Sequence, residues 1–291
     1  MRDYKIERDI RGVWRPRPRR ASKNNFGRIF ILAGSQGLTG AATLTSFAAL
    51  RAGAGLVTLG CPERVYSILA RRRPEVMVHP FPSTHEGGLS ERGFSEIIRF
   101  SKTQDVLAVG PGLGRHSSTQ KLVRRIFESV EVPLVVDADG INAFKGHVEI
   151  LRKCREIPIF TPHAGEFLRV FGGKKPVSDE ERKKRTVETA RKFRVVLVLK
   201  GYHTVIAAPN GKVALNPTGN PGMATGGTGD VLTGIIAALS GQGMSAFDAA
   251  RFGAYLHGLA GDLAVREKGE ISLVAGDLID FFPRAVKLVL K

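Results

Sequence analysis

A run of small residues that ends in an aspartate could carry out phosphoryl-transfer chemistry. Residues 226–230 read Gly-Gly-Thr-Gly-Asp, and an apolar helical pattern begins at Val231. Glycines let backbone N–H groups approach an anion, and a helix start adds unpaired donors and the positive end of a dipole. Asp230 would repel a phosphate, but it could take the proton of a hydroxyl that attacks one. The segment therefore predicts an anion site with a base, or a plain turn in which Asp230 caps the helix.

Two other small-residue runs follow apolar segments that read as strands. Residues 34–42 read Gly-Ser-Gln-Gly-Leu-Thr-Gly-Ala-Ala, and residues 110–114 read Gly-Pro-Gly-Leu-Gly. In a parallel sheet, ligands bind off the carboxyl ends of the strands. Both runs would let a phosphate or a flat ligand lie close to the backbone, although the first lacks the lysine of a P-loop and could be a simple helix start.

Carboxylates and a histidine end the next two strand-like runs. Asp137 and Asp139 follow 134–136, and His163 and Glu166 follow the run that ends at Phe160. Paired carboxylates at a strand end could hold Mg²⁺ through water, or either aspartate could cap the next helix. His163 is either structural, as a lone histidine usually is, or a substrate contact, and its place at the ligand-binding edge favours the contact. We interpret Glu166 as either a helix-start carboxylate or an outer partner of the metal.

A cation ends the strand-like run 195–199. Residues 200–204 read Lys-Gly-Tyr-His-Thr, and a lysine at this edge suits a nucleotide phosphate. The alternative is a surface turn with an exposed lysine.

The elements that position these residues alternate between strands and helices, which predicts a mostly parallel sheet covered by helices on both faces. Asn210-Gly211 predicts a hairpin and therefore antiparallel strands at one edge. We expect a basic arm over 1–25 and one domain over 26–291. The predicted strands are 28–33, 56–60, 106–109, 134–136, 157–160, 195–199, 204–208 and 212–215. Helix-length amphipathic segments lie between most of these strands, for example 41–52, 119–129 and 178–192, and further helices are predicted at 231–239, 246–266 and 275–290.

Composition narrows the class of protein. The chain has 291 residues, a formal net charge of +17 and two cysteines, Cys61 and Cys154, in no metal-binding spacing. The basic residues are dispersed and not interleaved with aromatics, which argues against a nucleic-acid partner. There is no apolar run long enough for a membrane span and no signal-peptide core, so we expect a cytoplasmic protein.

Six runs in this order resemble the ADP-dependent NAD(P)H-hydrate dehydratase family of the ribokinase-like superfamily, over about residues 26–270. The resemblance implies a three-layer α/β/α sandwich. The runs are GSQGLTGAA (34–42), VGPGLGR (109–115), DADGIN (137–142), TPHAGEF (161–167), LKGYHTVIA (199–207) and NPGMATGGTGDVLTGIIAAL (220–239).

The family implies repair of the S epimer of hydrated NADH or NADPH. ADP would phosphorylate the 6-hydroxyl, AMP would leave, and loss of phosphate would restore the dihydropyridine, with Mg²⁺ expected. Asp230 would be the base. The dinucleotide would contact Ala41, Gly112, Gly114, His163 and Asp230. The nucleotide would contact Lys200, Gly201, Tyr202, His203, Thr204, Gly226, Gly227, Thr228 and Gly229. The metal contacts, which we predict from the strand-end residues themselves, are Asp137, Asp139 and Glu166, either directly or through water.

Many relatives carry an N-terminal epimerase domain, whereas this chain has only the basic arm over 1–25 in that place. We therefore expect a separate epimerase to act in the same pathway, and the resemblance suggests a homotetramer. The residues PGMATGG (221–227), which lead into the glycine-rich run before Asp230, favour the branch of the family that uses ADP. The alternatives are an ATP-dependent vitamin kinase of the hydroxyethylthiazole type and a non-catalytic nucleotide sensor.

Overall fold

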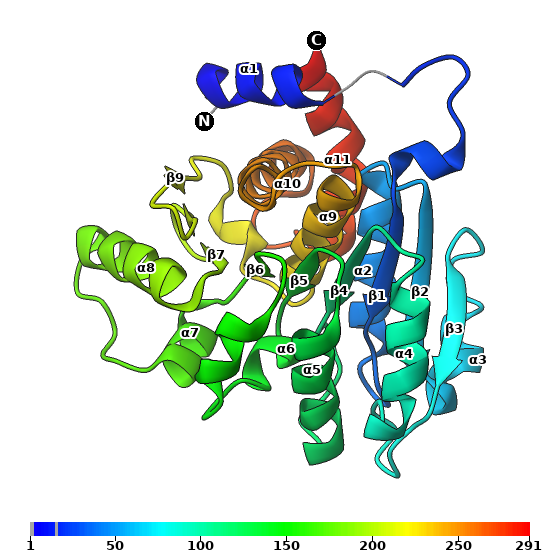
Figure 1. Cartoon of the computed structure of the whole chain (residues 1–291). Helices are drawn as coiled ribbons and strands as arrows, with labels where there is room; N and C mark the ends of the chain where they lie inside the picture. Colours follow the sequence, from blue (N-terminus) through cyan, green and yellow to red (C-terminus); the bar gives the residue numbers. More distant parts are fainter. Residues whose placement is uncertain (1–2, 15–16) are drawn as a thin grey trace.

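A nine-stranded sheet forms the centre of the part of the chain described by a computed structural model, residues 3–14 and 17–291 (Figure 1). The strand order is β3-β2-β1-β4-β5-β6-β7-β8-β9, with parallel pairing from β3 to β7 and antiparallel pairing of β8 and β9. The strands are β1 Arg28–Leu32, β2 Leu56–Pro62, β3 Met77–Phe81, β4 Val106–Val109, β5 Leu134–Val136, β6 Ile159–Phe160, β7 Val196–Leu199, β8 Val205–Ala207 and β9 Val213–Leu215.

Helices cover both faces of the sheet because its strands are apolar on both sides. Ile29 and Ile31 of β1 belong to one buried cluster, whereas Phe30 and Leu32 belong to the other. Helices α2, α9, α10 and α11 pack on the first face, and α4, α5, α7 and α8 pack on the second. None of the described helices is long and apolar enough to cross a membrane. The helices are α1 Tyr4–Val13, α2 Thr39–Arg51, α3 Tyr66–Leu69, α4 Phe94–Ser101, α5 Ser117–Ser129, α6 Asp139–Asn142, α7 Ala164–Phe171, α8 Asp179–Phe193, α9 Thr228–Gly241, α10 Ala246–Lys268 and α11 Ala275–Leu290, with short 3₁₀ turns at Lys23–Phe26, Glu63–Val65, Glu91–Gly93, Val148–Lys153 and Pro221–Met223.

The predicted sandwich and its antiparallel edge are confirmed. The short helices α3, α4, α6 and α7 were not among those located from the sequence, and three other elements differ from the prediction. Strand β3 was not predicted, because His79 and Pro80 interrupt its apolar run; a proline is tolerated there because β3 is an edge strand. Strand β6 begins after Pro158 and is shorter than expected. Helix α9 begins at Thr228 and not at Val231, so Asp230 lies inside its first turn and is not its cap.

The predicted arm over 1–25 contains the ten-residue helix α1, which is held against α10 and α11. Asp3 caps α1, and the hydroxyl of Tyr255 in α10 donates to the fully buried carboxylate of Glu7 at 2.8 Å. Arg251 of α10 pairs with Asp9 at 3.1 Å. Residues 1, 2, 15 and 16 of the arm lie outside the described residues, and the domain boundary at residue 26 stays a prediction.

Helices α2 and α9 pack unusually closely, and a glycine makes this possible. A Cβ at Gly234 in α9 would lie 2.1 Å from the carbonyl oxygen of Thr45 in α2 and 2.9 Å from the Cβ of Ala48. Gly234 therefore sets the distance between α9, which carries Asp230, and α2, which follows the loop after β1.

Substitution of Gly234 by alanine is expected to lower the free energy of unfolding. The new methyl group must push apart two backbones, and overpacking of this kind costs about 1 to 3 kcal/mol. Gly12 in α1 is a matched helical control, because a Cβ there would meet nothing within 4 Å. Gly12→Ala should leave stability unchanged or raise it by up to about 1 kcal/mol. Urea denaturation of both variants checks this; a Gly234→Ala protein as stable as the wild type would contradict the packing argument.

Candidate active site

Five neighbouring loops meet at the carboxyl edge of the sheet. They follow β1, β4, β5, β6 and β7, which are adjacent in the strand order. The N-terminus of α9 reaches the same edge: a Cβ on Gly229 would lie 3.1 Å from Nζ of Lys200 and 3.9 Å from Oδ2 of Asp137. The fold therefore brings the predicted anion loop, the predicted phosphate cation and one predicted carboxylate together.

Asp137 is a buried carboxylate that joins three of these elements. Asp137 follows the last residue of β5 and is only 1% exposed to solvent. Oδ1 accepts a hydrogen bond from the hydroxyl of Thr161 at 2.7 Å and from Nζ of Lys200 at 2.9 Å. Oδ2 accepts from the hydroxyl of Thr233 in α9 at 2.7 Å. A buried carboxylate must be paired and hydrogen-bonded, and Asp137 is both.

Lys200 remains charged in this environment. Burial by itself works to lower the pKa of Lys200, but the negative charges of Asp137 and Glu166 outweigh it and leave the pKa raised. The ammonium group therefore places a fixed positive charge beside the backbone of Gly229.

Asp230 sits in a contrasting environment. Burial raises the pKa of its carboxyl to about 7, the charge of Asp137 adds to this effect, and Lys200 partly opposes it. Nothing among the described residues is seen to donate a hydrogen bond to this carboxylate. A half-buried carboxyl that titrates near neutral pH suits a general base.

The N-terminus of α9 offers unoccupied backbone donors. Gly227 takes a positive φ of 92° at the cap position, and the cap has no side-chain hydrogen bond. The first N–H groups of this helix are thus available to an anion. Thr228 instead donates its hydroxyl to the carbonyl oxygens of Met223 and Thr225, each at 3.1 Å.

His257, which sequence reasoning did not single out, hydrogen-bonds to the backbone of this loop at Thr228. Burial lowers the pKa of its imidazole to about 4, so the ring is neutral. Its Nε2 lies 2.9 Å from the carbonyl oxygen of Thr228, and the neutral ring therefore donates a hydrogen bond there. Thr161 and Thr233 were missed as well, because a lone threonine carries no sequence signal for a hydrogen bond to a distant aspartate.

The predicted dinucleotide contacts Ala41, Gly112 and Gly114 lie together. Gly112 has a φ of +62°, and a Cβ there would lie 3.0 Å from the Cβ of Ala41. The backbone N–H of Gly114 donates to Oδ2 of Asp139 at 3.0 Å. Asp139 also accepts from Asn142, so it fixes the glycine loop in place.

His163 and Glu166 form the capping box of α7. Nδ1 of His163 accepts from the N–H of Gly165 at 3.0 Å, and Glu166 accepts from the N–H of His163 at 2.9 Å. Burial raises the pKa of the Glu166 carboxyl. The His163 side chain is 55% exposed, but its Nε2 lies 3.5 Å from Oε1 of Glu166, so a ligand that binds this nitrogen must share it with that carboxylate or displace it.

The loop from Lys200 to Thr204 presents an aromatic surface. The rings of Tyr202 and His203 stack at 3.9 Å, and Tyr202 is 79% exposed. Arg182 of α8, which sequence reasoning missed, donates to the carbonyl oxygens of Leu199, Tyr202 and His203. These three bonds hold the loop on which a nucleotide base could stack.

The three carboxylates predicted as metal contacts do not form one ligand group. Asp137 and Asp139 spend both oxygens on protein donors, and Glu166 accepts from the backbone of its own helix. Over residues 3–14 and 17–291, the group whose ligand atoms do approach one another lies elsewhere and consists of His85, Glu86 and His116.

A groove of about 640 Å³ lies away from this site, between α1, α2 and α11. None of the predicted site residues lines it; basic and apolar residues such as Arg11, Trp14 and Lys287 do. The groove is therefore a different place from the carboxyl edge of the sheet, where the predicted site residues lie.

The sequence profile of the NAD(P)H-hydrate dehydratase family matches residues 29–284. A bifunctional NAD(P)H-hydrate repair enzyme, Nnr, from Moorella thermoacetica is 47% identical over 273 residues, which are 93% of this chain and 52% of that protein. The corresponding enzyme from Escherichia coli is 35% identical over 272 residues. The chain thus spans about half the length of the curated relatives that it matches.

Solved structures agree with the observed fold. One of them is an ADP/ATP-dependent NAD(P)H-hydrate dehydratase from Bacillus subtilis that was co-crystallised with ATP and Mg²⁺. It superposes on this chain with a TM-score of 0.81 and is 31% identical in sequence, and the match covers 97% of each chain. A hydroxyethylthiazole kinase from Pyrococcus horikoshii superposes with a TM-score of 0.63 at 15% identity, which shows a shared fold alone.

The raised pKa of Asp230 makes stability depend on pH. The folded protein keeps this proton up to about pH 7, whereas the unfolded chain releases it near the ordinary value of 3.8. Folding therefore takes up a proton between these values, and stability falls as the pH rises through the window. We expect Asp230→Asn to be more stable than the wild type above pH 7, by up to about 4 kcal/mol. Urea denaturation between pH 4 and 8 checks this, and a gain that does not shrink toward pH 4 would contradict it.

Thr233 should matter through its hydroxyl. Thr233→Val keeps the shape but leaves Oδ2 of the buried Asp137 without a donor, which costs about 1 to 3 kcal/mol. Thr233→Ser is the matched control, because it keeps the hydroxyl and loses only a methyl group. Thermal and urea denaturation of both variants measure the difference; a valine variant as stable as the serine variant would exclude the proposed role of the hydroxyl.

Proposed function

This chain belongs to the NAD(P)H-hydrate dehydratase family, and from that premise we propose that it dehydrates the S epimer of hydrated NADH or NADPH at the expense of ADP. The observation that carries this proposal is the raised pKa of Asp230 beside an uncapped helix N-terminus and the Lys200 ammonium. A base, an anion site and a fixed cation are the parts that phosphoryl transfer to a hydroxyl needs.

In the proposed reaction, Asp230 takes the proton of the 6-hydroxyl on the hydrated nicotinamide ring. The hydroxyl oxygen forms a bond to the β-phosphorus of ADP, and the bond from that phosphorus to the bridging oxygen breaks, so AMP leaves. The carbon–oxygen bond then breaks, phosphate departs with the electron pair, and loss of a ring proton restores the dihydropyridine. Because phosphate is a far better leaving group than hydroxide, consumption of ADP makes the dehydration feasible.

The protein groups divide between the two ligands in this proposal. Backbone N–H groups of Gly226 to Gly229 and the ammonium of Lys200 hold the transferring phosphoryl group. The ring pair of Tyr202 and His203 faces the adenine base, and Gly201 and Thr204 complete that loop. The hydrated dinucleotide lies along Ala41, Gly112 and Gly114, with His163 at its rim.

Mg²⁺ is the expected ion, as in the co-crystal of the Bacillus subtilis dehydratase with ATP and Mg²⁺. Both oxygens of Asp137 and of Asp139 already accept from protein donors, and among the described residues no three carboxylates converge at this edge. We therefore propose that Mg²⁺ arrives on the phosphates of the nucleotide and meets the protein through water, as this ion commonly does.

The family match favours this reaction over that of a vitamin kinase with the same fold. The R epimer would need an epimerase before it could react here, so we propose an epimerase as the pathway partner. A cytoplasmic setting, where ADP and NAD(P)H are abundant, fits the reaction, and the homotetramer stays a prediction.

Asp230→Asn should remove turnover while leaving nucleotide binding intact. Loss of a positioned base typically costs about 10² to 10⁴ in rate. The assay follows the near-ultraviolet absorbance of the dihydropyridine with hydrated NADH, Mg²⁺, and ADP or ATP added separately. In the wild type, kcat/KM should rise with pH through about 7, as the carboxyl of Asp230 loses its proton.

Titration calorimetry with ADP shows whether the Asp230→Asn variant still binds the nucleotide. Near-normal turnover in the variant would reject Asp230 as the base. No turnover of hydrated NADH by the folded wild type with either nucleotide would reject the proposed function.

A further inference from the structure

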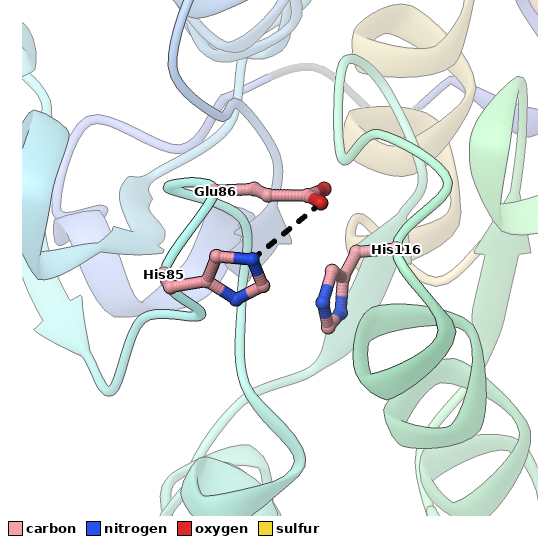
Figure 2. Close-up of side chains that lie close together, drawn as sticks. All are labelled: His85, Glu86 and His116. Carbon is pink, nitrogen blue, oxygen red and sulfur yellow. Dashed lines mark ion pairs between the residues drawn. The ribbon is translucent and has the colours of Figure 1, made fainter.

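Two histidines and a glutamate lie close together on a surface outside the proposed reaction site (Figure 2). One ligand atom from each of His85, Glu86 and His116 falls within 4.8 Å of the others. Nε2 of His85 is 3.7 Å from Oε1 of Glu86, and the two imidazole rings meet edge to face with centroids 5.4 Å apart. The nitrogens and the carboxylate therefore share one small volume.

The backbone that carries His85 and Glu86 is held by two hydrogen bonds. The two residues are the centre of a turn in which the N–H of Gly87 donates to the carbonyl oxygen of Thr84 at 3.1 Å. Gly87 has a φ of +80°, which suits a glycine at this point of a turn. Arg64 donates to the carbonyl oxygen of His85 at 2.9 Å. The turn thus fixes where both side chains start.

His116 comes from a different part of the chain. It lies just after Gly114 in the loop that follows β4 and is the N-cap of α5. Its Nδ1 accepts a hydrogen bond from the N–H of Ser118 at 3.1 Å. The cluster therefore bridges the loop after β3 and the loop after β4.

We propose that His85, Glu86 and His116 bind a divalent transition-metal ion of the zinc type, with one coordination position left open. Two imidazoles and a carboxylate are a ligand set that suits zinc and its first-row neighbours, whereas Mg²⁺ and Ca²⁺ prefer oxygen alone. Metal–nitrogen bonds of about 2.1 Å place tetrahedral ligands about 3.4 Å apart. The side chains of His85 and Glu86 are 79% and 62% exposed, so rotation about their own bonds closes the remaining distance.

Binding competes with the cap of α5. While Nδ1 of His116 accepts from Ser118, the neutral ring carries its proton on Nε2. Ligation through Nε2 moves that proton to Nδ1, and ligation through Nδ1 occupies the acceptor, so either route gives up the cap hydrogen bond. The affinity is therefore lower than that of a site with preformed ligands.

The ion would hold together two loops that border the proposed dinucleotide site. The turn contacts the loop after β1, because the N–H of Gln36 in that loop donates to the carbonyl oxygen of Gly87 at 3.1 Å. His116 follows the loop of Gly112 and Gly114. The proposal uses none of the residues assigned to the reaction, so it stands or falls independently of the proposed function.

Titration of the tag-free protein with Zn²⁺, in competition with a chelating dye, tests the site. We expect one Zn²⁺ per chain, with binding weakened at least about tenfold in His85→Asn and in His116→Asn. Asparagine at position 116 still caps a helix, so this variant keeps its fold while it loses the imidazole. His147→Asn is the matched control, because His147 is an exposed histidine outside the cluster, 3.8 Å from Glu149.

The expected pattern is weakened binding in both cluster variants, unchanged binding in His147→Asn, and no displacement of Zn²⁺ by excess Mg²⁺. The proposal is overturned if the wild type binds no Zn²⁺. Equal affinity in the wild type and both cluster variants would overturn it as well, since the ion would then lie elsewhere. Circular dichroism of each variant confirms that differences in binding do not come from unfolding.

Discussion

The buried carboxylate of Asp137 is the interaction on which the arrangement of this site depends. It stands at the end of β5 and receives donors from the loop after β6, from the end of β7 and from α9. Each donor that moved away would leave part of a negative charge unpaired in the interior, at a cost of about 1 to 3 kcal/mol for a hydroxyl and more for the Lys200 ammonium. These elements are therefore held in one relative position, and the N-terminus of α9 is held with them.

The same charge also sets the electrostatics of its neighbours. Asp137 is compensated by Lys200 and two hydroxyls, whereas Asp230 receives no comparable donor from the residues that the structure describes and is desolvated. Two carboxylates at one edge are thereby driven toward different tasks, one structural and one suited to proton transfer. Lys200 serves both, because it neutralises Asp137 while its ammonium lies beside the anion loop.

Glycines contribute to this site in two ways that a sequence does not separate. A Cβ on Gly110 would lie 1.8 Å from the carbonyl oxygen of Asp137, so this glycine permits the close approach of two strand ends. At Gly227, the positive φ lets the chain turn into α9 without a side-chain cap. The first role is packing and the second is ligand access, yet both residues stand in similar glycine-rich runs.

The sequence by itself determined the architecture and named most of the residues of the candidate site. Apolar runs alternate with helical patterns, and that periodicity reflects burial on both faces of the sheet. The edge strand β3, which contains His79 and Pro80, escaped it, as did the short helices α4 and α7. The sequence also indicated the strand-end residues from Gly112 to Lys200, because parallel strands must end at one edge. The tertiary structure alone decided what each one contacts. The bonds of Thr233 to Asp137, 96 positions away, and the meeting of His85 with His116 depend on loops brought together by packing. Local sequence carries no record of such distant pairs, so the tertiary fold had to supply them.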